Sequence, residues 1–137
     1  MSDTTRNAGF RFRLENTSGI PVYRQIIDQV LTAISTGALT AGAQLPTVRQ
    51  VAVDLEINPN TVVRAYRELE IRQVLMTQQG MGTFITPRKI KKDEADHGRR
   101  LTRFVAEFTS RAGAEGFTTS ELIERLKELP NEQDKRR

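Results

Sequence analysis

The chain of 137 residues contains no cysteine, no tryptophan and only one histidine, His97. Without cysteine it has no disulfide bond, no thiolate metal site and no cysteine nucleophile. A single histidine in a polar run also excludes a histidine-rich metal site and a conventional Ser-His triad. The sequence has no phosphate-binding loop and no pair of converging carboxylates, so we expect no metal, no cofactor and no enzymatic activity.

Long apolar runs are also missing. No stretch approaches the roughly 20 apolar residues that cross a bilayer, and residues 1–15 lack the apolar segment of a secretion signal. We therefore predict a cytoplasmic protein with no membrane partner. The formal charge of +4 is split evenly between residues 1–88 and 89–137, so net charge permits a nucleic-acid partner without requiring one.

What the chain does contain is a succession of short periodic segments, which begins with an N-terminal arm over residues 1–19. We expect residues 1–9 to be disordered, because they are small and polar. In Phe10–Glu15 apolar and charged residues alternate, which predicts a short strand.

Three helices are predicted after the arm. Apolar residues at helical spacing predict helices over 21–36 and 48–55, the second with Thr47 as its N-cap. The third begins at Pro59, because the first turn of a helix tolerates the missing N–H of proline, and Asn58 is a suitable N-cap. It continues to about residue 72. The apolar stripes of the first and third helices are predicted to lie in the core and comprise Tyr23, Ile26, Ile27, Val30, Leu31, Ile34, Val62, Ala65, Tyr66 and Leu69.

A β-hairpin is predicted next, with strands at 75–78 and 83–86 and a turn at 79–82 that contains two glycines. Three helices followed by a hairpin, with a tight turn between the second and third helices, are typical of a winged helix-turn-helix. We therefore predict a mainly α fold with a small β-hairpin, in which residues 20–88 form a DNA-binding domain.

In a winged helix-turn-helix the start of the third helix enters the major groove, where asparagine can pair with adenine and arginine with guanine or phosphate. The methyl groups of Val63 could meet a thymine methyl, and the turn glycines let the backbone approach DNA closely. The alternative is that the arginines are solvated helix charges and that Thr47 and Asn58 are only helix caps. The predicted DNA-binding residues are Thr47, Arg49, Asn58, Asn60, Thr61, Val63, Arg64, Arg67, Gln79, Gly80, Gly82 and Thr83.

Residues 89–137 are predicted to form a charged linker that extends to residue 100, two helices and a disordered tail. Each helix carries one apolar stripe, and Thr118 with Glu121 predicts a capping box at the start of the second. Two short helices cannot bury these stripes alone. They must pack on the winged helix of the same chain or, as we expect, on a second chain in a homodimer. The predicted interface residues are Leu101, Phe104, Val105, Phe108, Leu122, Ile123 and Leu126.

Four segments in this order resemble the DNA-binding domain of GntR-type bacterial transcription regulators: PVYRQI at 21–26, GALTAGAQLPTVRQVA at 37–52, NPNTVVRAYRELE at 58–70 and QGMGTFI at 79–85. The third segment and the short C-terminal portion are similar to the YtrA subfamily. The resemblance implies a homodimeric repressor, in many members one of transport-related genes.

Within the resemblance, Arg49 matches the arginine of the family's LP-x-x-R, and residues 79–83 match its wing sequence Q-G-x-G-T. The wider family opens its third helix with Ser/Thr-Arg-x-Thr-Val-Arg. This chain instead has Pro59 and Val63 at the two arginine positions, with an arginine one residue later. The base contacts that we predict in their place come from Asn58, Asn60, Thr61 and Arg64.

These patterns together predict a sequence-specific, DNA-binding transcription regulator that represses from a near-palindromic operator as a homodimer. A small-molecule effector is compatible with the sequence, which does not identify one. Two alternatives stay open. A nonspecific architectural DNA-binding protein would show a steep salt dependence and little sequence preference, and a winged-helix protein-interaction module would bind duplex DNA poorly at any salt concentration.

Overall fold

The computed structural model describes residues 10–87 and 94–130, which form two separate compact units. The disorder predicted for residues 1–9 and for the C-terminal tail at 131–137 lies outside the described residues, as does the linker segment 88–93. Within the described ranges, no helix combines the length and the hydropathy that crossing a bilayer requires.

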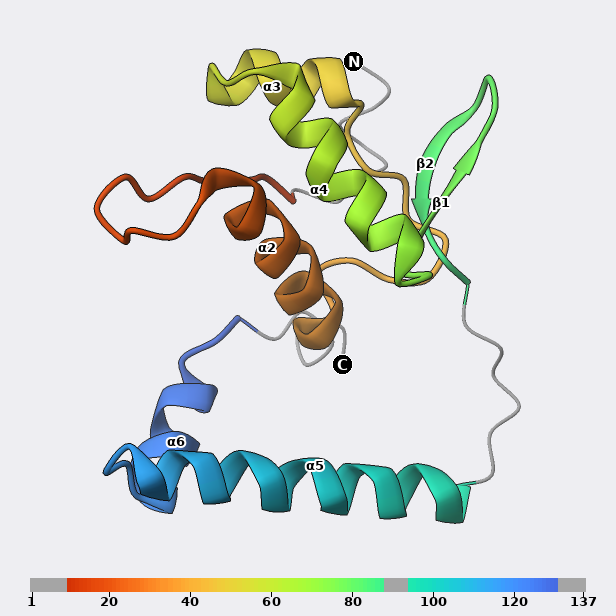
Figure 1. Ribbon diagram of the computed structural model, residues 1–137. Helices are drawn as coiled ribbons and strands as arrows, with labels where there is room; N and C mark the ends of the chain where they lie inside the picture. Colours follow the sequence, from red (N-terminus) through yellow and green to blue (C-terminus); the bar gives the residue numbers. More distant parts are fainter. Residues whose placement is uncertain (1–9, 88–93, 131–137) are drawn as a thin grey trace. The chain divides into compact units, whose positions relative to one another are not determined.

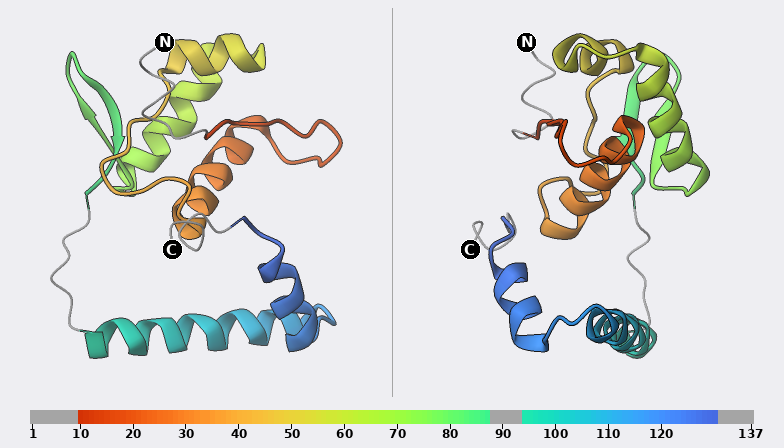
Figure 2. Two further views of the ribbon diagram at one scale, coloured as in Figure 1. Left: turned by 180° about the vertical axis from the view of Figure 1, so that it is seen from behind. Right: turned by 60° about the vertical axis from the view of Figure 1, so that its left-hand side comes forward.

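The first unit consists of three helices followed by a two-stranded antiparallel hairpin (Figure 1). This order confirms the predicted winged helix-turn-helix. Helix α4 packs against α2, α3 and β1, so it is the central element of the unit. The hairpin extends away from the helices in the front and rear views (Figures 1 and 2). The elements are α2 (Val22–Thr36), α3 (Val48–Leu55), α4 (Pro59–Ile71), β1 (Leu75–Gln78) and β2 (Gly82–Ile85).

The hydrophobic core of this unit lies where α2 meets α4. Ile26, Ile27 and Val30 of α2 are buried, as are Val62 and Leu69 of α4. These are the residues whose helical spacing predicted one apolar stripe on each helix. Each such side chain stabilises the fold by about 1.5–3 kcal/mol when it is removed from water, so the stripes fix how the central helix is held.

Two caps set the sharp turn between α3 and α4. The N–H of Glu56, which has a left-handed φ of 56°, bonds to carbonyls at the end of α3. The Asn58 side chain then accepts a hydrogen bond from the N–H of Asn60 at 2.8 Å, and Pro59 is the first helical residue. The predicted start of α4 is therefore confirmed, and the turn leaves α4 free to begin at the surface.

The predicted strand Phe10–Glu15 is wrong, because this segment pairs with none of the strands in the part of the chain that the structure describes. Its backbone is instead held by side chains of α2. The Gln29 amide exchanges two hydrogen bonds with the peptide groups of Arg13, and the Gln25 amide does the same with Glu15 at 2.8 and 3.0 Å. Two extended residues and one helical turn both span about 6 Å, so alternate peptide groups meet successive glutamines.

The second strand of the hairpin is shifted by one residue from the predicted 83–86. It runs over Gly82–Ile85, with Gln78 opposite Gly82. The loop therefore has three residues rather than four, and the N–H of Met81 bonds to the carbonyl of Gln78 at 2.8 Å. Gly80 is therefore the third residue of the turn 78–81, and its φ of 81° is the positive value that a type II turn requires there.

The second unit contains α5 (Glu94–Ala114) and α6 (Thr119–Lys127). The prediction of a charged linker is wrong over 94–100, which is already helical. Asp96 lies in the first turn of α5, where a negative charge stabilises the helix, and it pairs with two arginines that follow at i+3 and i+4. The charges that indicated a linker therefore stabilise a helix start.

The start of α6 confirms the predicted capping box. The Thr118 hydroxyl accepts a hydrogen bond from the N–H of Glu121, and the Glu121 carboxylate accepts one from the N–H of Thr118 at 2.8 Å. That backbone hydrogen bond, with a second from the Thr118 hydroxyl, lowers the pKa of Glu121 below its ordinary value. The charged carboxylate is thus the form that caps the helix.

Candidate nucleic-acid interface

The exposed face of α4 presents polar side chains in a line, as predicted. Asn60, Arg64 and Arg67 follow one another at i, i+4 and i+7 and are all exposed, whereas Thr61 and Val63 are half-buried beside them. A shallow hollow on this face is lined by Asn60, Val63, Arg64, Arg67, Glu68 and Ile71. The face can therefore donate several hydrogen bonds along a DNA groove, either to the edges of the bases or to the phosphates beside them.

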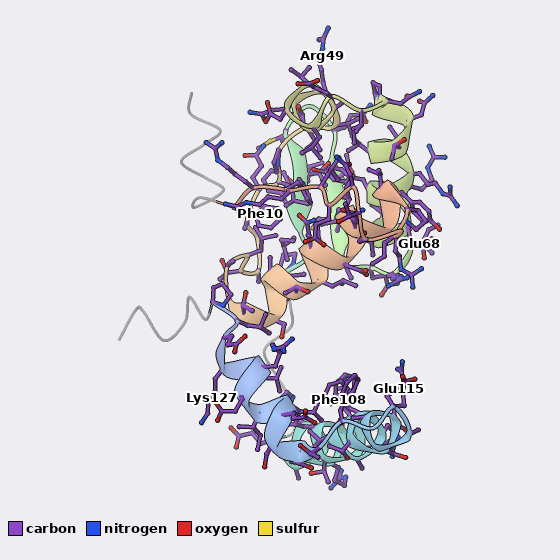
Figure 3. All side chains as sticks on the ribbon, turned by 90° about the vertical axis from the view of Figure 1, so that its left-hand side faces the viewer. Phe10, Arg49, Glu68, Phe108, Glu115 and Lys127 are labelled. Carbon is purple, nitrogen blue, oxygen red and sulfur yellow. The ribbon has the colours of Figure 1, made fainter. Side chains whose placement is uncertain are left out.

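The acidic residues near this face are bonded to other partners. Glu68 pairs with Arg72 at 3.2 Å, and Glu70 accepts a hydrogen bond from the Thr77 hydroxyl on β1. Among the described residues, Arg49 and Arg67 take part in no ion pair. Arg49 projects from α3 into solvent (Figure 3). Both guanidinium groups are therefore available to bind a phosphate through charge-assisted hydrogen bonds.

Arg64 has a partner that its sequence neighbourhood does not reveal. The central carbon of its guanidinium group lies 3.7 Å from the centre of the Tyr23 ring, which is cation–π stacking distance. Tyr23 belongs to α2 and is half-buried against the core. Its spacing predicts a core position, but only the packing of α2 on α4 brings the two side chains together.

Thr47 and Asn58 act as helix caps, as the more conservative interpretation expects. The Thr47 hydroxyl accepts a hydrogen bond from the N–H of Gln50 at 3.0 Å, and Asn58 caps α4 in the same way. Each cap uses one acceptor site of its side chain, while the hydroxyl hydrogen of Thr47 and the amide N–H groups of Asn58 are donors. Both residues are exposed at helix starts, so capping and an anion contact are compatible.

The helix starts differ in charge between the two units. None of α2, α3 and α4 has an acidic residue in its first turn, whereas α5 has two and α6 has one. The N-terminus of a helix carries a partial positive charge and free N–H groups that attract anions. The first unit therefore leaves this attraction unneutralised at its helix starts.

The hairpin places the four predicted wing residues in different surroundings. Gln79 and Gly80 are exposed at the tip, next to Met81, which is 63% exposed. Gly82 and Thr83 are half-buried, and the Thr83 hydroxyl lies 3.4 Å from that of Thr77. The tip can reach a partner, whereas Thr83 faces the side of the hairpin that is bonded to α4.

Gln44 supports the wing, and the sequence patterns do not indicate it. Residues 43–45 run along the outer edge of β2, through backbone hydrogen bonds of 2.8 Å from Leu45 to Thr83 and from Ile85 to Ala43. From this edge the Gln44 amide donates to the carbonyl of Met81 at 3.0 Å. The loop before α3 thus holds the hairpin tip, through a contact between residues 37 positions apart.

Tyr66 is a core residue and not part of the exposed face. Its side chain is 4% exposed, and its hydroxyl donates to the carbonyl of Pro46 at 2.7 Å. Burial raises the pKa of the Tyr66 hydroxyl, so the phenol stays neutral. The hydrogen bond joins α4 to the loop that leads into α3.

The predicted dimer residues lie on a largely exposed apolar stripe in the single chain. Phe104 is 66% exposed and Phe108 is 41% exposed, whereas Leu122 is half-buried. The stripe also includes Leu101, Val105, Ile123 and Leu126, all exposed.

The described residues contain no group of three or more histidine, aspartate or glutamate side chains arranged to hold a metal ion.

Comparison with known proteins identifies the family to which this chain is similar. The profile described as "Bacterial regulatory proteins, gntR family" matches residues 22–85, which span the three helices and the hairpin. The chain is 37% identical over 111 residues to the uncharacterized HTH-type transcriptional regulator YhcF of Bacillus subtilis, and the match covers 80% of this chain and 90% of that protein.

Two further similarities concern proteins named YtrA. The HTH-type transcriptional repressor YtrA of Bacillus subtilis is 39% identical over 74 residues, which are 54% of this chain and 57% of that protein. The solved structure of YtrA from Sulfolobus acidocaldarius, a GntR-family transcription factor, superposes with a TM-score of 0.52 and 27% identity, and covers 84% of this chain and 92% of that one.

Proposed function

This chain belongs to the gntR family of bacterial regulatory proteins, within its YtrA subfamily, and on that premise we propose that it represses transcription as a homodimer on a near-palindromic DNA operator. Family membership makes it a DNA-binding transcriptional regulator, and its relatives are regulators rather than enzymes. The sign of regulation, the dimer and the operator are the proposal.

The exposed face of α4 is the observation that carries the proposal. Asn60, Arg64 and Arg67 share that face, and neither arginine forms an ion pair with another described residue. They follow a helix start that can approach DNA. We assign base contacts to Asn58, Asn60, Thr61 and Arg64. Val63 is assigned an apolar contact with a thymine methyl. Backbone contacts are assigned to the other residues of the predicted set: Thr47, Arg49, Arg67, Gln79, Gly80, Gly82 and Thr83.

The division of labour along the chain is part of the same proposal. Residues 20–88 bind DNA, residues 1–19 form an arm, and residues 89–137 join two chains through the apolar stripe. Two such chains related by two-fold symmetry read two half-sites. A small-molecule effector would act by changing the placement of the two reading heads. We place the protein in the cytoplasm, on nucleoid DNA, with transport-related genes among its targets, because the YtrA resemblance implies them.

Selection of bound sequences from a random duplex pool tests the proposal. We expect one enriched motif with two related halves. Arg64→Ala should cost about 1–3 kcal/mol of binding free energy on that motif and relax the preference at one base pair. Arg49→Ala should weaken binding to all sequences more evenly, because phosphate contacts carry no sequence information.

Arg125→Ala is the matched control, since it removes the same charge from an exposed position on α6, in the other unit, where Arg125 pairs with Glu128. It should bind the selected motif as the parent protein does. A pool that yields no enriched motif, together with a steep salt dependence, would instead support the architectural alternative. Weak duplex binding at every salt concentration would support the protein-interaction alternative.

A further inference from the structure

The stacked pair Arg64–Tyr23 is a contact between the α4 face proposed to read DNA and a different helix. The guanidinium carbon is 3.7 Å from the ring centre. Arg64 is exposed, but Tyr23 is half-buried and packs against the core. One end of this contact is therefore anchored in the folded unit, and the other is at the surface.

Stacking and hydrogen bonding use different parts of a guanidinium group. The flat face of the group lies on the aromatic ring, while its N–H bonds point outward in its own plane. A face-on stack therefore leaves an edge free for a bidentate contact with a planar pair of acceptors. The stack also restricts a long side chain that otherwise loses much conformational entropy when it binds.

We propose that Tyr23 is a positioning residue for sequence reading, which holds the Arg64 guanidinium so that its free edge makes a bidentate contact with a guanine of the operator. In the major groove, guanine presents two acceptors that match this edge. The inference rests on the proposed function, because it assigns a role within the same DNA contact. Tyr23 itself does not touch the base.

The test compares Tyr23→Leu, Tyr23→Phe and Arg64→Ala on the selected operator and on operators with one base pair changed at a time. Tyr23→Leu removes the ring and should weaken operator binding about 3- to 10-fold, the range of an exposed to partly desolvated cation–π contact. The lost discrimination should fall on the one guanine position that Arg64→Ala also affects. Tyr23→Phe keeps the ring and should bind as the parent protein does.

A double variant, Tyr23→Leu with Arg64→Ala, separates positioning from general packing. If Tyr23 acts through Arg64, the double variant should bind no more weakly than Arg64→Ala alone. Binding is measured well below the thermal unfolding midpoint of each variant, so that loss of core packing does not enter the comparison. A merely structural role would lower that midpoint without changing preference at a single base pair.

Four results would overturn the inference. Tyr23→Phe as weak as Tyr23→Leu would show that the hydroxyl itself makes the contact. Tighter binding by Tyr23→Leu would show that the ring withholds Arg64 from DNA. An even loss across all operator variants would assign Arg64 to a phosphate, and unchanged binding would show that the stack has no role. If the parent protein selects no motif, the proposed function itself is wrong, and this result is obtained before any variant is made.

Discussion

At the residue scale, Tyr66 offers a test of stability that is separate from DNA binding. Tyr66→Phe should lower the free energy of unfolding by about 1–2 kcal/mol, because it leaves the carbonyl of Pro46 without its hydrogen-bond donor. Urea unfolding at neutral pH measures this. Tyr23→Phe is the control, since the structure gives the Tyr23 hydroxyl no hydrogen bond to a described residue, and it should change stability little.

The raised pKa of Tyr66 adds a dependence on pH with a definite sign. The folded pKa lies above the ordinary value of 10.0, so the neutral phenol stabilises the fold fully below pH 10. Above that pH the unfolded chain loses the proton first, and this stabilisation falls as pH rises. The stability difference between the parent protein and Tyr66→Phe should therefore shrink above pH 10. A difference that is absent at neutral pH, or that grows above pH 10, would contradict the assignment.

Single-residue roles are predictable when their cause is local. Asn58 and Pro59 indicate a helix start by their own chemistry, and the structure confirms both. Tyr66 is recognisable as core from helical spacing. The partners of Tyr23 and Tyr66 are not recognisable, because Arg64 and the Pro46 carbonyl reach them through contacts between distant parts of the chain.

At the scale of elements, the wing depends on Gly82. A Cβ atom at Gly82 would lie 2.5 Å from Nε2 of Gln44, and the backbone φ of +129° is strained for any other residue. Gly82→Ala should therefore destabilise the hairpin by about 1–3 kcal/mol and displace the Gln44 amide from the Met81 carbonyl. Thermal unfolding measures the first effect, and the chemical shift of the Gln44 side-chain amide reports the second.

Gly80→Ala is the matched control in the same loop. Gly80 also has a positive φ, but a Cβ there would meet nothing within 4 Å, so only the cost of backbone conformation should appear. We expect Gly82→Ala to be the more damaging change and Gln44→Ala to relieve part of its cost. Equal stability of Gly80→Ala and Gly82→Ala would show that the close approach of Gln44 does not matter.

Elements that form through interactions between sequence neighbours are predictable, and those that depend on side chains from distant parts of the chain are less so. The spacing of α3 and the capping box of α6 are local, and both elements begin where the sequence indicates. The alternation in 10–15 predicts extended backbone but not its partner, because two glutamines of α2 take the place of a strand. Residues 94–100 look like a linker until ion pairs within one turn are recognised as helix-stabilising.

At the scale of the whole molecule, the two units differ in how they bury apolar surface. The first has a core of its own, whereas α5 and α6 carry large side chains that stay exposed in one chain. Fewer than about 40 residues rarely support an independent core, and a face of this kind marks an interaction surface. The sequence predicts the stripe by its periodicity, but periodicity alone cannot choose between a second chain and the same chain.

Phe108→Asp distinguishes those two choices. In a dimer that buries the stripe, an unpaired carboxylate at Phe108 should weaken association by about 2–4 kcal/mol, or roughly 30-fold and more. Sedimentation should show the parent protein as a dimer and the variant as a monomer. The variant should then bind the two-part operator weakly while keeping the parent's affinity for a single half-site.

Ser110→Asp is the control for that change, because Ser110 is exposed on the side of α5 opposite Leu101 in a helix that turns about 100° per residue. It adds the same charge outside the stripe and should leave both the dimer and operator binding intact. A monomeric parent protein whose free energy of unfolding falls with Phe108→Asp would assign the stripe to packing within one chain. In that case two separate chains would have to bind the two half-sites of the operator cooperatively. Operator occupancy would then rise more steeply with protein concentration than it does for a preformed dimer.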